Sequence, residues 1–201
     1  MKSIYELKPA FQRLLRPLNR RLTGIGLNAN HITIIALALS VFTGIAVAIW
    51  PQQRCALLAV PLVLFIRMAL NAIDGMLARE HDMKSSLGAV LNELGDVFSD
   101  VAIYLPFCLI NGIKSWLVVM IVIAGVVVEM AGVVAVQIGA ERRYDGPMGK
   151  SDRAFVFGFI AFAAGLGFSL EPWVNIVLAG VLILSAVTIV NRVRGALKEV
   201  S

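Results

Sequence analysis

Charged residues, cysteine and histidine are all scarce in this sequence. Charged residues make up 15% of the 201 residues, there are two cysteines and two histidines, and 59% of the residues are hydrophobic. Soluble domains are roughly 45–50% apolar, so this composition indicates a single membrane domain over residues 1–201. Cys55 and Cys108 could form a disulfide if their side of the membrane is oxidising, but apolar packing is the favoured role for both.

Several patterns that identify other classes of protein are also missing. The sequence has no internal repeat, low-complexity segment, P-loop, dinucleotide-binding fingerprint or Ser/His/Asp arrangement. Its net charge of +5 does not require nucleic acid as a partner, because anionic lipid in the cytoplasmic leaflet attracts the same basic residues. We therefore expect membrane lipid, and no nucleic acid, around this protein.

Long apolar segments dominate the chain. Six of them are long enough to cross a bilayer of about 30 Å, and they cover residues 32–50, 55–77, 87–110, 116–140, 154–170 and 173–190. Before them, apolar residues recur on one helical stripe of residues 3–23, which is typical of an interfacial amphipathic helix. The sequence thus predicts an all-α membrane bundle of six transmembrane helices over residues 32–196, preceded by that helix.

The basic residues predict the orientation of the bundle. If the N-terminus is cytoplasmic, only Arg54 and Lys114 fall outside, and Arg67 falls within a span. By the positive-inside rule, both termini and the loops 78–87 and 140–154 are then cytoplasmic. The basic residues on that side are Lys2, Lys8, Arg13, Arg16, Arg20, Arg21, Arg79, Lys84, Arg142, Arg143, Lys150, Arg153, Arg192, Arg194 and Lys198.

Polar side chains interrupt two of the apolar segments. Asn71 and Asp74 share one helix face, and Asn92, Asp96 and Asp100 recur at every fourth residue in the next segment. A charge inside a bilayer costs about 2.5–3.5 kcal/mol on insertion scales, so such residues usually belong to a functional site. Two facing stripes of carboxylate and amide oxygens predict a Mg²⁺ or Mn²⁺ site. The lack of cysteine and histidine in both stripes argues against zinc.

The spacing of these residues carries a family resemblance. The run is Asn71-x2-Asp74-Gly75-x2-Ala78-Arg79-x8-Gly88-x3-Asn92-x3-Asp96. It resembles the signature of the CDP-alcohol phosphatidyltransferase family, D-x2-D-G-x2-A-R-x8-G-x3-D-x3-D, with its spacing intact. Asn71 and Asn92 stand where the family has its first and third aspartates.

The resemblance implies an activity and a location. The family transfers a phosphatidyl group from CDP-diacylglycerol to the hydroxyl of an alcohol and releases CMP, in phospholipid biosynthesis. By resemblance, Asp96 is the catalytic base, and Asn71, Asp74, Asn92 and Asp96 hold Mg²⁺ or Mn²⁺. The resemblance also implies a homodimer in the bacterial inner membrane, and the charge pattern places the active site on the cytoplasmic side.

Donor-binding residues also follow from the resemblance. The segment Ala29-Asn30-His31-Ile32-Thr33 is similar to the P-N-x-x-T element at the start of the family's first transmembrane helix, with Ala29 in place of proline. Asn30 is also expected to cap that helix. The resemblance assigns the CDP part of the donor to Asn30, Thr33, Gly75, Ala78, Arg79 and Gly88.

A basic loop precedes the fifth apolar segment. Basic residues at a helix N-terminus can bind an anion, and Gly149-Lys150 followed by Arg153 resembles the loop that binds the phosphate of a phosphorylated acceptor in several family members. Positive-inside topology explains the same residues without a ligand. The predicted acceptor-binding residues are Arg142, Arg143, Lys150 and Arg153, and the sequence does not identify the acceptor alcohol.

Three further charged residues are predicted as auxiliary to the site. Because Asn71 and Asn92 each lack a negative charge, we expect either one metal ion or a second ion whose site is completed by Glu93 or Asp100. These two carboxylates could instead bind the acceptor or pair with Arg67. Arg67 itself could neutralise the site in place of a second cation, or form a buried pair with Glu129.

Two other functions remain open from the sequence. The chain could be a catalytically weakened or inactive family member that binds the nucleotide-lipid or acts as a partner subunit. A small cation or proton transporter would explain the buried acids Asp74, Asp96, Asp100 and Glu129, but it would not explain the glycine, alanine and arginine spacing of the motif.

Overall fold

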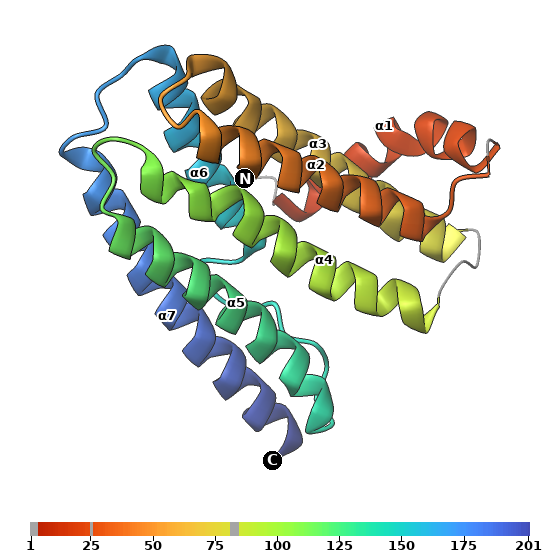
Figure 1. Cartoon of the computed structure of the whole chain (residues 1–201). Coiled ribbons are helices and arrows are strands. Elements are labelled where there is room, and N and C mark those ends of the chain that lie inside the picture. The colour runs from red at the N-terminus through yellow and green to blue at the C-terminus, as the bar shows by residue number, and fades with distance from the viewer. Residues whose placement is uncertain (1–3, 25, 81–84) are drawn as a thin grey trace.

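The computed structural model describes residues 4–24, 26–80 and 85–201. Within these ranges the chain is helical and contains no strand (Figure 1), which confirms the predicted all-α class. Lys2 and Lys84, two of the basic residues predicted to be cytoplasmic, lie outside the described ranges. The elements are α1 Ile4–Gly24, α2 Ala29–Ile49, α3 Arg54–Glu80, α4 Ser86–Tyr104, the 3-10 helix η1 Leu105–Leu109, α5 Ser115–Gln137, α6 Lys150–Leu166 and α7 Trp173–Val200.

Four described helices are long and apolar enough to cross a membrane. They are α2, α3 over Arg54–Arg79, α5 and α7, so the protein is an integral membrane protein. The other two predicted spans coincide with α4, which carries three carboxylates, and α6, which has 17 residues. Length and composition therefore support four of the six predicted spans. Helix α1 forms where the amphipathic helix is predicted, and its interfacial location stays a prediction.

The start of α2 corrects one local prediction. Asn28, and not Asn30, caps this helix: the backbone N–H of His31 donates to Asn28 Oδ1 at 3.0 Å, and the N–H of Asn28 donates to His31 Nδ1 at 3.3 Å. The reciprocal bonds satisfy two backbone donors that a helix N-terminus leaves free. Because the cap is formed two residues earlier, the side chain of Asn30 is available for another role.

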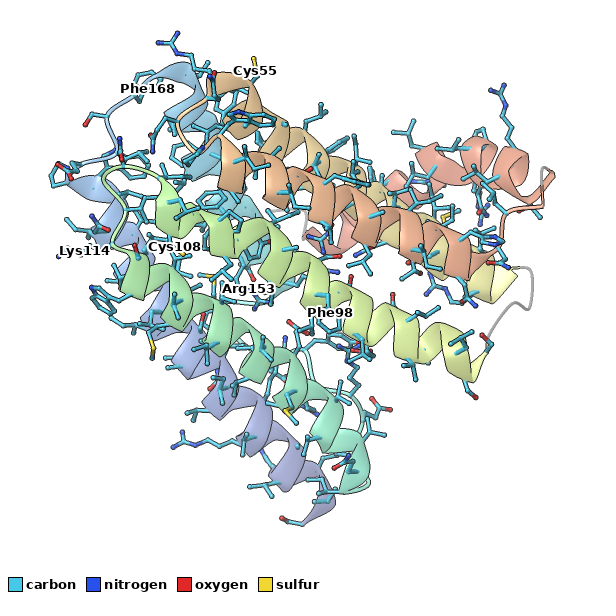
Figure 2. The ribbon with its side chains drawn as sticks, viewed as in Figure 1. Cys55, Phe98, Cys108, Lys114, Arg153 and Phe168 are labelled. Carbon is cyan, nitrogen blue, oxygen red and sulfur yellow. The ribbon has the colours of Figure 1, made fainter. Side chains whose placement is uncertain are left out.

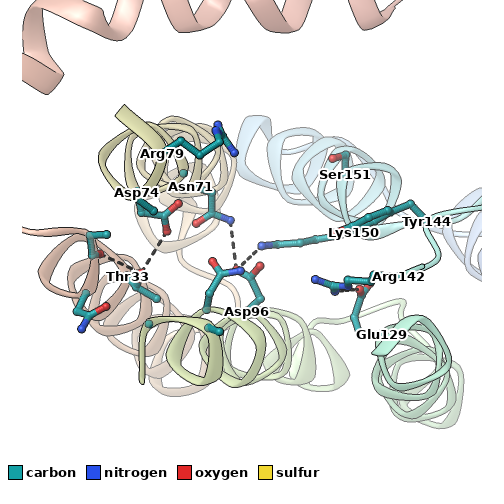
Figure 3. Close-up of a pocket in the computed structure, with 18 of the residues that line it drawn as sticks. Thr33, Asn71, Asp74, Arg79, Asp96, Glu129, Arg142, Tyr144, Lys150 and Ser151 are labelled. Atoms are coloured by element: carbon teal, nitrogen blue, oxygen red, sulfur yellow. Dashed lines mark hydrogen bonds and ion pairs between the residues drawn. The ribbon is translucent and has the colours of Figure 1, made fainter. Parts of the chain in front are cut away.

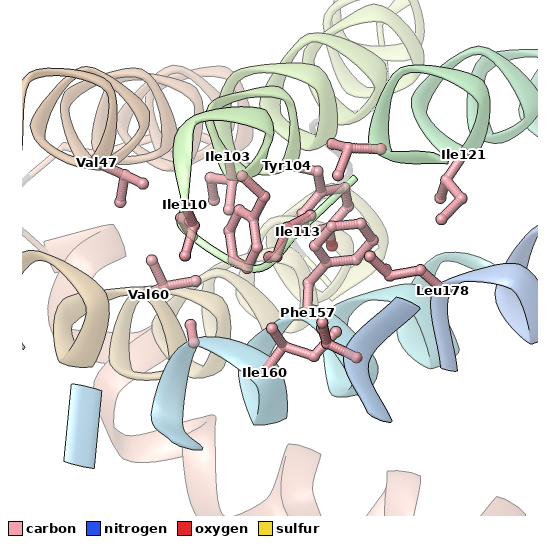
Figure 4. Packing of buried hydrophobic residues seen from close by; sticks show 14 of the residues in the cluster. Val47, Val60, Ile103, Tyr104, Ile110, Ile113, Ile121, Phe157, Ile160 and Leu178 are labelled. Atoms are coloured by element: carbon pink, nitrogen blue, oxygen red, sulfur yellow. The ribbon is translucent and has the colours of Figure 1, made fainter. Parts of the chain in front are cut away.

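The helices pack around one apolar core. Helix α2 lies between α3 and α4, α6 packs on α3, and α5 packs on α7. In the core shown in Figure 4, the ring of Phe157 stacks on Tyr104 at 4.3 Å between centroids and meets Phe107 edge-on at 5.0 Å. These contacts join α6 to the end of α4 and to η1, and so fix the depth of α6 beside α4.

A buried ionic network ties the helices together one turn deeper than the polar motif. Asp100 accepts hydrogen bonds from Arg67 at 3.1 Å and from Arg153 at 3.2 Å. Arg153 also donates to Glu129 at 3.1 Å, and Arg192 lies 3.4 Å from the same carboxylate. Figure 2 shows Arg153 inside the bundle, and only 2% of it is exposed. The alternative Arg67–Glu129 pair is wrong, because Asp100 on α4 is the carboxylate that Arg67 reaches.

The two cysteines are free in the structure. Cys55 is exposed, and Cys108 is partly buried, with its thiol donating to the carbonyl of Leu105. Both are labelled in Figure 2. Neither is bridged, and the apolar packing expected of both is seen for Cys108 alone, which packs against the core.

Gly44 marks the closest approach of α2 and α4. A Cβ atom built on this residue would lie 1.9 Å from the carbonyl oxygen of Ala102, which is backbone and cannot rotate away. Close approach of this kind is the usual reason for glycine at helix contacts in membranes. The contact sets the distance between α2, which carries Thr33, and α4, which carries Asp96.

We expect Gly44→Ala to lower the free energy of unfolding by about 1–3 kcal/mol, because α2 and α4 must separate to admit the methyl group. The measurement is unfolding by SDS in mixed micelles, followed by far-UV circular dichroism. Gly180→Ala is the matched control, since no atom lies within 4 Å of a Cβ built there, and it should change the stability by less than about 1 kcal/mol. Equal effects of the two substitutions would contradict the close contact.

Candidate functional site

Six helices bring their ends together around one polar cavity of about 710 Å³. Successive helices run in opposite directions, so the starts of α2, α4 and α6 meet the ends of α3, α5 and α7 at one side of the bundle. The cavity is lined from all six, and Figure 3 shows its side chains pointing inward from α2, α3, α4, α5 and α6. A polar site shared by so many elements needs the complete bundle to form.

The cavity collects every residue predicted to bind the donor or the metal ion. These residues come from sequence positions more than sixty residues apart, on α2, α3 and α4. The predicted donor residues on its wall are Asn30, Thr33, Gly75, Ala78, Arg79 and Gly88, and the predicted metal ligands are Asn71, Asp74, Asn92 and Asp96.

Two carboxylates of the motif face the cavity, one from α3 and one from α4. Asp74 is 7% exposed, and its Oδ2 lies 3.2 Å from the hydroxyl of Thr33. Asp96 Oδ1 accepts a hydrogen bond from Asn71 Nδ2 at 3.2 Å and pairs with the ammonium of Lys150, which reaches across from α6. Figure 3 shows these contacts converging between α3, α4 and α6. The arrangement offers oxygen ligands on one side and a cation on the other.

The oxygen ligands of the cavity fit a hard divalent cation. In the described part of the chain, no group of three or more His, Cys, Asp and Glu side chains is placed to hold a metal ion. Asp74 and Asp96 would therefore be joined by neutral ligands such as Asn carbonyl oxygens, or by oxygens of a bound substrate. Mg²⁺ and Mn²⁺ accept carboxylate, carbonyl and phosphate oxygens.

Small residues bring polar groups close together on the cavity wall. A Cβ atom built on Gly88 would lie 2.8 Å from Asn30 Oδ1 and 3.0 Å from Ser85 Oγ. A Cβ atom on Gly75 would lie 3.3 Å from the guanidinium of Arg79. Glycine at these two positions thus admits an amide and a guanidinium that a larger residue would displace.

The predicted acceptor residues are divided by the structure. Arg142 and Lys150 line the cavity. Arg153 does not, because it is buried between Asp100 and Glu129 in the ionic network. Arg143 also lies off the cavity wall, and donates to Asp145 and Glu199 at 2.7 Å each.

The Arg143–Asp145 pair shapes the loop beside the cavity. The hydrogen bond from the Arg143 guanidinium holds the pKa of the Asp145 carboxyl below its usual range. This pair lies in the loop between α5 and α6, and so helps to order the segment that carries Tyr144 and Gly149 to the cavity.

Of the predicted auxiliary residues, Glu93 lies beside the cavity, and Arg67 and Asp100 lie deeper in the bundle. Glu93 pairs with Arg142, and Arg142 also lies 3.6 Å from Glu129 and 4.9 Å from the centre of the Tyr144 ring. Arg67 and Asp100 form the buried pair one turn below. Arg67, Glu93 and Asp100 are therefore all engaged with opposite charges of the protein itself.

Several cavity residues were not predicted from the sequence. Arg192 of α7 lines the cavity, donating to Glu129 and, at 2.7 Å, to the carbonyl of Val128. Its sequence position after the last apolar segment is explained by topology alone, so nothing singled it out. Glu129 also lines the cavity, although the sequence suggested it only as a partner for Arg67 or as one acid of a transport path. Tyr144 and Asp152 line the cavity as well, and no sequence pattern marked them as site residues.

An apolar cavity adjoins the polar one. It has a volume of about 580 Å³, lies between α3 and α6, and shares Asn71, Lys150 and Ser151 with the polar cavity. Its remaining wall is mostly apolar and aromatic. These apolar residues are Pro61, Leu64, Phe65, Met68, Ala154, Phe155, Gly158, Phe159 and Phe162.

Comparison with known sequences finds a family that covers most of the chain. Residues 27–192 match the sequence model of the CDP-alcohol phosphatidyltransferases. The chain is 45% identical over 195 residues to the inner membrane protein YnbA of Escherichia coli K12, covering 97% of this chain and 96% of that protein. It is also 32% identical over 103 residues to a phosphatidylinositol phosphate synthase of Mycobacterium marinum, covering 51% of this chain and 42% of that enzyme.

Solved structures share the fold. A Mycobacterium tuberculosis phosphatidylinositol phosphate synthase in complex with manganese and citrate superposes with a TM-score of 0.76 at 20% identity, covering 90% of this chain and 88% of that one. The same enzyme with CDP-DAG bound gives a TM-score of 0.72 at 21% identity, with 94% of each chain covered. At this identity the likeness establishes the fold alone.

Proposed function

Because the chain belongs to the CDP-alcohol phosphatidyltransferase family, we propose that it transfers the phosphatidyl group of CDP-diacylglycerol to the hydroxyl of an alcohol and releases CMP. The observation that carries the proposal is the polar cavity, which gathers the motif residues of α3 and α4 with Asn30 and Thr33 of α2. The structure of a relative with CDP-DAG bound supports the choice of donor.

The two cavities suggest how the donor is divided between them. Its cytidine diphosphate fits the polar cavity, beside the small residues Gly75 and Gly88. Its acyl chains fit the apolar cavity between α3 and α6. The two spaces share Asn71 and Lys150, so the diphosphate would lie where the polar wall meets the apolar one. Binding at this boundary holds the reacting phosphorus beside Asp96.

The chemistry needs a base at the acceptor hydroxyl. The hydroxyl oxygen forms a bond to the phosphatidyl phosphorus, the bond from that phosphorus to the CMP oxygen breaks, and Asp96 takes the hydroxyl proton. Thr33 orients the Asp74 carboxylate, and Asn71 orients that of Asp96. A divalent cation held by Asp74 and Asp96, with Asn71 and Asn92 as neutral ligands, would supply positive charge to the donor diphosphate.

The acceptor site is proposed at the Arg142 side of the cavity. Arg142 lines the wall with Tyr144 and Arg192, and this cationic edge favours an anionic or phosphorylated alcohol. Arg143 and Arg153 would act indirectly, by holding the loop and the ionic network in place. The basic residues on this side of the bundle place it at the cytoplasmic face of the inner membrane, in keeping with the location named for the Escherichia coli relative.

The test supplies purified protein in lipid with CDP-diacylglycerol, Mg²⁺ or Mn²⁺, and a pool of glycerol phosphate, inositol phosphate, serine, phosphatidylglycerol and simple polyols. We expect one new phospholipid, whose mass identifies the acceptor. Loss of that product in Arg142→Gln, with retention in Arg54→Gln at the other end of α3, would support the acceptor site. A protein that binds the donor and forms no product with any alcohol would be the non-catalytic binder.

A further inference from the structure

We propose that the site holds one divalent cation, and that the ammonium group of Lys150 provides the donor diphosphate with the positive charge that a second cation would otherwise supply. The inference rests on the proposed function for the identity of the donor. It concerns three residues, Lys150, Asn71 and Asn92, and it follows from which charges in the cavity are free and which are already paired.

The carboxylates available for metal binding are few. Asp74 and Asp96 face the cavity from α3 and α4, and the two other oxygen ligands of the motif, Asn71 and Asn92, are neutral. A cation is held mainly by the charge of its carboxylates, so this pair balances the charge of one divalent ion. A second ion would add two positive charges, and the other carboxylates on the cavity wall, Glu129 and Asp152, are already held by Arg153 and Arg192 and by the N–H of Gly149.

The nearby carboxylates cannot complete a second site. Glu93 is paired with Arg142, and Asp100 is held by Arg67 and Arg153. Recruiting Asp100 would leave the buried guanidinium of Arg67 without its partner, which is strongly unfavourable in a membrane bundle. Recruiting Glu93 would break its ion pair with Arg142. The sequence left open a second ion completed by Glu93 or Asp100, and their contacts argue against it.

Lys150 already occupies the place of a second positive charge. Its Nζ pairs with Asp96 Oδ1, the same oxygen that accepts from Asn71 at 3.2 Å. In the interactions of the described residues, Oδ2 of Asp96 has no partner, so it stays available to a metal ion. A second cation at Asp96 Oδ1 would meet an ammonium group at contact distance and be repelled.

The position of Lys150 in the fold suits this role. It is the first residue of α6, and this end of the helix lines the cavity with Gly149, Lys150, Ser151 and Asp152. Asp152 caps the helix by accepting from the N–H of Gly149 at 2.9 Å. Lys150 also lies on the wall shared by the polar and apolar cavities, where the diphosphate is placed. Lys150 and Arg79 together then balance the charge of that diphosphate.

The test counts bound Mn²⁺ by electron paramagnetic resonance, with full-length protein in lipid nanodiscs and without donor. The expected count is one Mn²⁺ per wild-type chain, with no signal from coupled pairs of ions. In Lys150→Met the count should stay at one, and Mn²⁺ should bind about tenfold more tightly. The reason is that a charge at contact distance changes the binding of another ion by one or more powers of ten, and the variant removes the repulsion between the ammonium group and Mn²⁺. An unchanged Mn²⁺ affinity in Lys150→Met would mean that Lys150 only packs against Asp96, and it would contradict the proposal.

A gain of function completes the test. The triple variant Asn71→Asp, Asn92→Asp, Lys150→Met should bind two Mn²⁺ ions, while Asn71→Asp, Asn92→Asp with Lys150 retained should bind the second ion at least about tenfold more weakly. Two bound ions, or none, in the wild-type chain would overturn the proposal. This result does not depend on whether the triple variant folds. Metal counting needs no turnover, so one bound ion without any CMP release would refute the proposed function and leave the one-cation site standing.

Discussion

Replacing Asp96 with asparagine is expected to reduce CMP release by about 10²–10⁴-fold, the usual contribution of a general base. The substitution keeps the shape of the side chain and its contact with Asn71, but it removes the group that takes the proton from the acceptor hydroxyl. It also removes one of the two carboxylates proposed to hold the metal ion. The measurement is the initial rate of CMP release from CDP-diacylglycerol in lipid, at saturating acceptor.

The matched control is Glu171→Gln, which also exchanges a carboxylate for an amide. Glu171 is exposed, lies between α6 and α7 and does not line the polar cavity. We expect its rate to stay within about twofold of the wild-type rate, because a surface substitution away from the site changes little. Normal turnover by Asp96→Asn would show that another group is the base and would remove the central assignment.

Replacing Asp100 with asparagine is expected to lower the free energy of unfolding by about 3–5 kcal/mol, because it leaves a buried guanidinium uncompensated. Asp100 is 8% exposed and joins Arg67 of α3 to Arg153 of α6. Loss of the Asp100 charge affects Arg67 most, because Arg153 still forms an ion pair with Glu129. The measurement is SDS unfolding, followed by circular dichroism, as for Gly44→Ala.

The double variant Arg67→Met, Asp100→Asn provides the control. Removing both members of a buried ion pair is often close to neutral, so the double variant should be more stable than Asp100→Asn alone. If Asp100→Asn lowered the stability by less than about 1 kcal/mol, the value typical of exposed pairs, the network would not hold α3, α4 and α6 together as a buried ion pair should.

The position of the site could be predicted from the sequence, because spacing and span direction are local properties. The four-residue spacing of Asn92 and Asp96 places both on one side of a helix. The alternation of apolar segments brings the ends of successive helices to the same face. Together they predict that residues of three helices meet, and the cavity does contain them. The assignment of a metal ion and of the donor to these residues stays a prediction.

Individual pairings could not be predicted, since they depend on how each helix is rotated in the bundle. From depth alone, Arg67 could meet Glu129 or Asp100, and only the packing of α4 between α2 and α5 decides for Asp100. The same packing buries Arg153, which the sequence placed in an open loop site. The sequence did not predict the pair of Lys150 and Asp96, because this contact depends on where α6 begins relative to α4.

The number of spans was also beyond the reach of the sequence. Apolar length counts α2, α3, α5 and α7, but α4 carries carboxylates that the bundle itself neutralises, and α6 is short. A helix surrounded by other helices can carry charge that a lipid-facing helix cannot. Hydropathy therefore counts α3, whose site residues lie in the second half of a long apolar helix, but not α4, whose three carboxylates are spread along a shorter one.

The central claim is a phosphatidyl transfer that releases CMP, and its most direct test measures both products together. Purified wild-type protein in lipid is given CDP-diacylglycerol and the acceptor pool across a titration of Mg²⁺ and Mn²⁺, with a chelator as the zero point. We predict CMP release that requires a divalent cation and matches the new phospholipid mole for mole. Donor binding without CMP release at any cation concentration would contradict it.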